Sequence, residues 1–145
     1  MSTLFDLAQR ICRGDSLPPP VARLVGFTLT SIAPGHARIA FEAGAQHANP
    51  MGTLHGGILC DIADAAMGMA YASTLGAGET FTTLELKMNF LKPVWQASLQ
   101  AIGRVVQHGR TVGLVECDIL DADEVLVARA TSTCMTLRGD QARGR

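Results

Sequence analysis

The sequence predicts an α+β domain in which an antiparallel β-sheet packs against one long, buried helix. Three observations support this fold class. Residues 58–75 are almost entirely apolar and are long enough for about five helical turns. From Phe81 onward, apolar residues alternate with polar ones, as they do in half-buried strands. Turn-forming residues separate the segments, at positions 34–35, 108–110 and 121–123.

Length and composition narrow the possible classes of protein. The chain has 145 residues and a formal net charge of −1, which suits one domain with no nucleic-acid or membrane surface. The four cysteines are scattered without metal-ligand spacing, so we expect neither a disulfide framework nor a metal or cofactor site. Asp61 and Asp64 argue against a membrane span in the apolar run. The start of the chain does not resemble a signal peptide, and we expect a cytoplasmic protein.

The segments before the long helix form a short helix and a hairpin. Residues 4–12 have one apolar face and a cap at Ser2 or Thr3, and the following three prolines end the helix. Residues 1–20 are therefore predicted to be an N-terminal helix and a proline-rich linker. Residues 21–32 are predicted to be a strand with a bulge at Gly26, and the alternating residues 36–42 are predicted to pair with it.

The long helix is apolar on every face, so we expect protein to cover it all round. Gly76 is predicted to be its C-cap. Four strands follow, which we predict to form a meander of consecutive neighbours, at residues 81–90, 98–107, 111–120 and 124–137. A flat sheet covers only one face of a helix, so this helix requires a curled sheet or a second subunit. The main domain is thus residues 21–137, and residues 138–145 are a flexible basic tail.

One motif resembles a known family. The pattern Asn49-x-x-Gly52-x-x-His55-Gly56-Gly57, with Asp64 nine residues after His55, is similar to the acyl-CoA thioesterases of the phenylacetate-degradation type. Residues 89–93 and 107–111 also resemble that family. The resemblance implies the hotdog fold, in which a curved antiparallel sheet wraps a long helix. It also implies hydrolysis of an aromatic or medium-chain acyl-CoA to free acid and CoA, with CoA as part of the substrate and not a cofactor.

Thioester hydrolysis requires an aimed water molecule and a donor to the developing oxyanion. Gly56 and Gly57 open the helix, where backbone N–H groups are unpaired and the helix dipole is positive. The resemblance implies that the Gly56 N–H polarises the thioester carbonyl and that Asp64 is the general base or nucleophile. Gly57 is expected to contact the substrate, because glycine lets a ligand come close to the backbone. The alternatives are a plain entry turn at the glycines and a carboxylate bound to a neighbouring subunit. Asp61, on roughly the same side of the helix, is expected to be structural.

The spacing of these residues predicts a dimer. Gly56 and Asp64 are eight residues apart, which is about 12 Å along a helix. One thioester carbon is therefore not expected to meet both groups of the same chain. Two antiparallel helices about a twofold axis would bring Gly56 of one chain to Asp64 of the other and create two equal sites. The resemblance agrees with such a homodimer, and it adds a dimer of dimers.

Other polar residues are candidates for the same site. Asn49 either binds the attacking water or the thioester oxygen, or forms an Asx-turn before Pro50. The resemblance places a Ser or Thr that assists the acid at Thr83, although a slip of one residue would select Thr82 instead. His55 either bonds within its loop or flanks the carbonyl.

The rest of an acyl-CoA needs a basic rim and an apolar slot. Lys92 and Arg110 resemble family positions near the pantetheine and phosphates. Met67, Met69 and Tyr71 are candidate lining residues of the slot, with core packing as the alternative. Two other functions remain open. One is a non-catalytic acyl-CoA binding module. The other is a hotdog hydratase or dehydratase, which would need a histidine such as His55 facing the acid.

Overall fold

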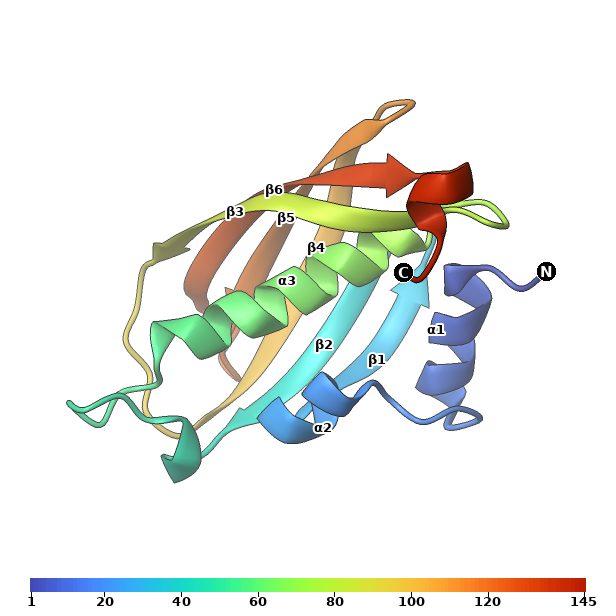
Figure 1. The fold of residues 1–145 in the computed structure, drawn as a ribbon. Coiled ribbons are helices and arrows are strands. Elements are labelled where there is room, and N and C mark those ends of the chain that lie inside the picture. The colour runs from blue at the N-terminus through green and yellow to red at the C-terminus, as the bar shows by residue number, and fades with distance from the viewer.

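A curled sheet of six antiparallel strands wraps around helix α3 (Gly56–Ala72) in the computed structural model, which describes all 145 residues (Figure 1). The α+β class predicted from the sequence is therefore confirmed. The strand order is β1-β2-β4-β5-β6-β3. The strands are β1 (Phe27–Ala33), β2 (His36–Ala43), β3 (Thr80–Phe90), β4 (Ala97–His108), β5 (Val112–Leu120) and β6 (Leu126–Leu137).

Two helices precede the sheet. In α1 (Leu4–Arg13), Thr3 is the N-cap and forms a capping box with Asp6. The second helix, α2 (Pro20–Val25), lies where the sequence predicted the start of a strand, so that prediction is wrong over its first half. A proline suits the first turn of a helix, and Gly26 ends α2 at φ 95° as a left-handed cap. The bulge predicted at Gly26 lies instead within β1, between Leu29 and Ser31.

The predicted meander of four strands is also wrong. Strands β4, β5 and β6 are consecutive neighbours, but β3 pairs with β6 at the far edge, and β2 pairs with β4. Helix α3 takes the chain across the sheet from β2 to β3 at the far edge. The segment after β3 then returns the chain to β4, beside β2. Strand β3 is therefore an edge strand, whose outer side has no partner in one chain.

The core lies between α3 and the concave face of the sheet. At Gly103 of β4 an added Cβ would lie 2.4 Å from the Ala66 carbonyl oxygen, so the strand approaches the helix backbone closely. The C-cap of α3 is Ser73 and not Gly76 as predicted. The Ser73 hydroxyl donates to the Ala70 carbonyl (2.6 Å) and accepts from the Gly35 N–H (2.8 Å), which ties this end of α3 to the β1–β2 turn.

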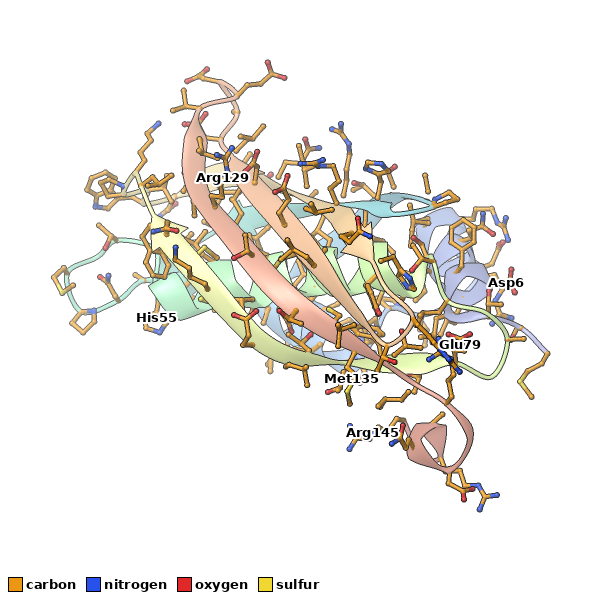
Figure 2. All side chains as sticks on the ribbon, turned by 90° about the horizontal axis from the view of Figure 1, so that it is seen from above. Asp6, His55, Glu79, Arg129, Met135 and Arg145 are labelled. Carbon is orange, nitrogen blue, oxygen red and sulfur yellow. The ribbon has the colours of Figure 1, made fainter.

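The curled sheet covers α3 on one side only, and the other face is open in the single chain, where the predicted all-round cover would require a second subunit. Gly57, Asp61 and Asp64 are exposed, whereas residues such as Ile62 and Ala66 on the opposite face are buried. None of the helices is both long enough and apolar enough to span a membrane. A short 3-10 helix (Gly139–Ala142) closes the chain. Figure 2 shows the sheet from above with all side chains.

Candidate active site

The first turn of α3 presents two unused backbone donors. His55 is the N-cap and Gly56 the first helical residue, and the N–H groups of Gly56 and Gly57 donate to no protein acceptor. A Cβ on Gly56 would lie 2.9 Å from the ring of Phe90, so glycine allows this ring to pack against the helix start. An open hollow of about 420 Å³ lies here, with Thr53 and Phe90 among its walls.

The loop before α3 is held by Asn49. Its Oδ1 accepts hydrogen bonds from the N–H groups of Met51 (3.0 Å) and Thr53 (3.1 Å), and its Nδ2 donates to the Thr53 hydroxyl (2.7 Å). This is the Asx-type arrangement that was the predicted alternative for Asn49. The His55 ring is exposed, lies against Gly57 and forms no side-chain hydrogen bond.

A second histidine of this loop, His47, has a structural role that the sequence did not reveal. Its Nδ1 accepts from the Gly44 N–H at 3.0 Å, so its Nε2 carries the proton and donates to the Val25 carbonyl at 2.8 Å. The buried ring also packs edge-on against Phe41. His47 thereby joins the end of α2 to the loop that leads into α3.

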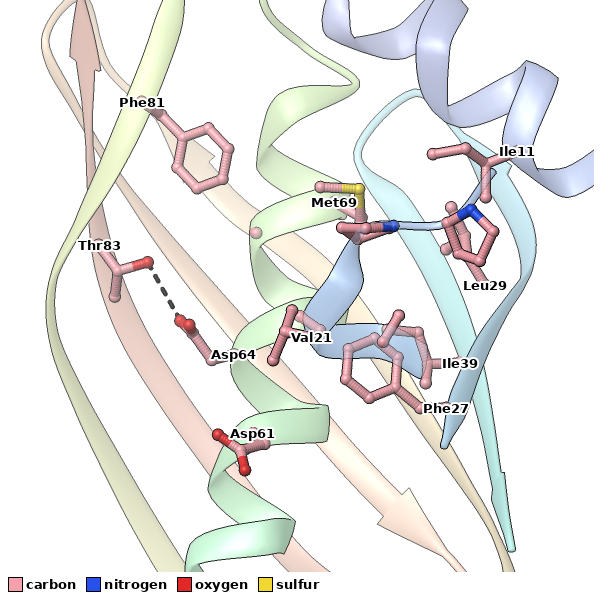
Figure 3. Close-up of a pocket in the computed structure, with 15 residues that line it drawn as sticks. Ile11, Val21, Phe27, Leu29, Ile39, Asp61, Asp64, Met69, Phe81 and Thr83 are labelled. Carbon is pink, nitrogen blue, oxygen red and sulfur yellow. Dashed lines mark hydrogen bonds between the residues drawn. The ribbon is translucent and has the colours of Figure 1, made fainter. Parts of the chain in front are cut away.

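Asp64 lies two turns further along α3 and is bound by a hydroxyl from β3. The Thr83 Oγ1 donates to Asp64 Oδ1 at 3.1 Å, as Figure 3 shows. Thr82, the alternative residue from the sequence, forms no such bond and pairs with Met135 in the sheet. A bulge after Thr83 interrupts the regular register of β3 with β6. The structure therefore brings Thr83, and not Thr82, to the acid.

An apolar cavity of about 290 Å³ opens beside Asp64. Asp61, Asp64 and Thr83 are its main polar lining groups, and Phe27 and Phe81 are among the apolar ones (Figure 3). The methionine that lines this cavity is Met69. Met67 and Tyr71, the other two candidates from the sequence, are fully buried in the core and do not line the cavity. Both differ from Met69 because residues two positions apart point to different sides of a helix.

Asp61 has a raised pKa. Partial burial disfavours its charged form, the negative charge of Asp64 raises the pKa further, and His55 opposes the shift. In the folded protein Asp61 therefore retains its proton to higher pH than in the unfolded chain. The free energy of unfolding consequently decreases as the pH rises from the unfolded to the folded pKa.

Asp61→Asn should therefore stabilise the protein at pH 7. The gain should be less than about 1 kcal/mol, because solvent screens an exposed carboxylate. It should shrink as the pH falls towards the ordinary range of an aspartate, where the wild-type side chain is also neutral. Urea unfolding of both proteins at pH 7 and at pH 4 measures the difference. An equal gain at both values would contradict the electrostatic cause.

The two basic residues singled out from the sequence lie far apart. Lys92 follows β3 near the start of α3, its backbone N–H binds the Val127 carbonyl, and its ammonium pairs with Asp121. Arg110 lies in the β4–β5 turn, two residues before Val112, which begins β5 and pairs with Met135 of β6. Eight residues of β6 separate these two positions, which is about 26 Å along a strand. One chain therefore does not bring Lys92 and Arg110 to the same phosphate.

The site residues thus divide into two groups within one chain. Gly56 and Lys92 line the hollow at the start of α3, and Asp64 and Thr83 line the apolar cavity. Gly56 and Asp64 lie on the same unbroken helix, eight residues apart. About 12 Å along the helix axis therefore separates the Gly56 N–H from Asp64.

This fold is that of the hotdog thioester hydrolases. A family model described as the thioesterase superfamily matches residues 51–128, more than half of the chain. The chain belongs to the thioesterase superfamily. The match includes α3, Asp64 and Thr83, and the resemblance stated from the sequence is confirmed.

Individual relatives agree with this family. A protein of Ralstonia eutropha JMP134, named as related to phenylacetic acid degradation, has a solved structure with a TM-score of 0.80; it is 32% identical, over 88% of this chain and 98% of that one. Human acyl-coenzyme A thioesterase 13 is 26% identical over 114 residues, 77% of this chain and 81% of that protein. A Saccharolobus solfataricus protein whose name describes an esterase is 39% identical over 87 residues, 60% of this chain; the match spans 61% of that relative's length.

Proposed function

We propose that the chain hydrolyses the thioester of an acyl-CoA to the free acid and CoA, at sites that two subunits share. The observation that carries the proposal is Asp64: a carboxylate bound by Thr83, at the mouth of an apolar cavity, on a helix whose first N–H groups are unused. An acyl group fits the cavity, and the thioester carbonyl then lies near the carboxylate.

Asp64 takes the central chemical role. The Thr83 hydroxyl binds Oδ1 and leaves Oδ2 to receive a proton from water. The resulting hydroxide attacks the carbonyl carbon, the C–S bond breaks, and the CoA sulfur leaves as a thiolate that takes up a proton. In the other form of the mechanism, Asp64 attacks the carbon directly and water cleaves the anhydride that results. In both forms, the Gly56 N–H stabilises the oxyanion.

The donor and the acid come from different chains in this proposal. Strand β3 pairs with β6 on one side only, and its other edge is free in the single chain. It also carries the apolar side chains of Leu84 (52% exposed) and Phe90 (56% exposed), which favour burial against a second copy of the chain. A twofold axis that makes the two α3 helices antiparallel places Gly56 of one chain opposite Asp64 of the other. We further propose that two such dimers form a tetramer.

The same symmetry accounts for the separation of the basic residues. His108 stacks on Tyr71 near the end of α3, with ring centroids 4.9 Å apart, so the adjoining Arg110 turn lies at that end. Lys92 lies at the other end, near Gly56. Antiparallel helices bring the Arg110 end of the partner towards Lys92, and the two cations together suit the anionic CoA nucleotide.

The acyl group that we propose is aromatic or of medium chain length. The apolar cavity, with Phe27 and Phe81 in its walls, supports such a group. The name of the Ralstonia relative, which refers to phenylacetic acid degradation, points in the same direction. A hydratase or dehydratase would need a histidine at the acid, and no histidine of the same chain lines the cavity with Asp64.

A panel of acyl-CoA esters, assayed by release of free thiol, tests the proposal. We expect the purified protein to turn over phenylacetyl-CoA, hydroxybenzoyl-CoA or octanoyl-CoA, with acetyl-CoA as a poor substrate because it leaves the cavity empty. Binding of these esters without release of thiol from any of them would instead establish a non-catalytic acyl-CoA binding module.

A further inference from the structure

We propose that the N-terminal segment, residues 11–22, is the far wall of the acyl cavity and sets the upper limit on the size of the acyl group. The inference rests on the proposed function, because it takes the cavity beside Asp64 as the acyl site. It adds a specificity determinant that lies outside residues 51–128, the part of the chain that the family model matches.

The cavity extends from the acid to this segment. Asp64 and Thr83 lie at one end, and Ile11 of α1 lies at the other (Figure 3). The N-terminal segment contributes a third of the lining residues: Ile11, Pro18, Pro19, Val21 and Ala22. An acyl chain whose carbonyl is held near Asp64 therefore points towards the N-terminal segment. As the chain becomes longer, its terminal carbons are the atoms that contact this segment.

The wall is fixed in place. Ala8 of α1 and Ala22 of α2 are almost fully buried, so each helix is packed against the domain. His47 donates a hydrogen bond to the Val25 carbonyl and holds the end of α2. Between the helices, consecutive prolines fix their own φ angles and restrict the residues before them. A longer acyl group would have to displace this packing in order to extend further.

The volume of the cavity is consistent with a small occupant. Pockets for small ligands have volumes of about 300 to 1,000 Å³, and at about 290 Å³ this cavity is at the lower end of that range. We therefore expect an acyl group with a single aromatic ring, or a chain of medium length, to fill the cavity, and a hexadecanoyl group to meet the wall.

Substitutions at the wall test the inference. Val21 is 50% exposed, so Val21→Trp and the double variant Ile11→Ala/Val21→Ala leave the deep core intact. The matched control is Leu24→Ala on the same short helix, where the side chain is 84% exposed and does not line the cavity. The wild type and these three variants are assayed for thiol release from butyryl-, octanoyl- and hexadecanoyl-CoA, and their kcat/KM values are compared. Binding of the corresponding non-hydrolysable alkyl-CoA thioethers is measured by calorimetry.

We expect the wall variants to change selectivity and the control to keep it. The double alanine variant should raise the preference for hexadecanoyl over octanoyl about tenfold, and Val21→Trp should lower the preference for octanoyl over butyryl about tenfold. Unchanged size preference in both wall variants, in rates and in thioether affinities, would overturn the inference. Absence of thiol release from every ester would overturn the proposed function alone, because the thioether affinities would still show whether the wall limits size.

Discussion

Replacing Asp64 with asparagine is expected to lower kcat for acyl-CoA hydrolysis by about 10² to 10⁴, the range that a positioned general base contributes. The amide oxygen of asparagine can still accept the hydrogen bond from Thr83, so the side chain keeps its place at the cavity. What it loses is the ability to take a proton from water or to attack the carbonyl carbon. The rate should therefore fall while substrate affinity remains.

The matched control is Asp61→Asn, one turn earlier on the same face of α3 and in the wall of the same cavity. It removes the same charge from the same surroundings but is not bound by Thr83, and we expect less than a tenfold change in kcat. Steady-state rates and the affinity for an alkyl-CoA thioether separate chemistry from binding. If Asp64→Asn kept more than a tenth of the wild-type rate, another group would have to be the base.

The sequence predicted those parts of the fold that depend on local patterns. Apolar residues around every face of residues 58–75 identified α3, because only a helix enclosed by protein tolerates such a surface. The family resemblance, and not the alternation, selected Thr83 over Thr82, and the hydrogen bond of 3.1 Å from Thr83 to Asp64 agrees with that choice. The spacing of Gly56 and Asp64 predicted their separation, because helix rise is constant.

Features that depend on tertiary packing were not predictable in this way. Alternation identifies a strand but not its neighbours, and β3 was therefore placed beside β4 when it pairs with β6. Residues 21–25 have the β-branched and apolar composition of a strand, yet Pro20 and Gly26 allow one short helix between them. Nothing in the sequence around His47 indicates that its two nitrogens join Gly44 to Val25, because both partners are backbone atoms.

The candidate site shows the same limit. Met67 and Met69 have the same side chain in the same apolar run, so the sequence does not distinguish them. The packing of α3 against the sheet determines that Met69 faces the cavity and that Met67 is buried in the core. Asn49 matches the motif, yet its side chain is used to hold the loop. The motif therefore identified the neighbourhood of the site, and the directions of the side chains came from long-range packing.

Gly56→Pro should lower kcat by about 10² to 10³, because it removes one oxyanion donor. The helix should accept the change. Proline is favoured at the first helical position, and His55 already has φ −63° and ψ 130°, the region preferred before proline. The matched control, Gly56→Ala, keeps the N–H and places a similar Cβ against the exposed ring of Phe90. It should retain most of the activity.

Combining the two inactive variants tests whether two chains share each site. In a heterodimer of Asp64→Asn with Gly56→Pro, one site receives both substitutions and the other receives an intact Gly56 and an intact Asp64. Co-expression in equal amounts makes about half of the dimers mixed, so activity should return to about a quarter of the wild-type value. A site contained within one chain would be broken in every subunit, and the mixture would then be as inactive as its two components. The recovered rate thus measures directly whether the Gly56 N–H and Asp64, about 12 Å apart along α3, act together across the dimer.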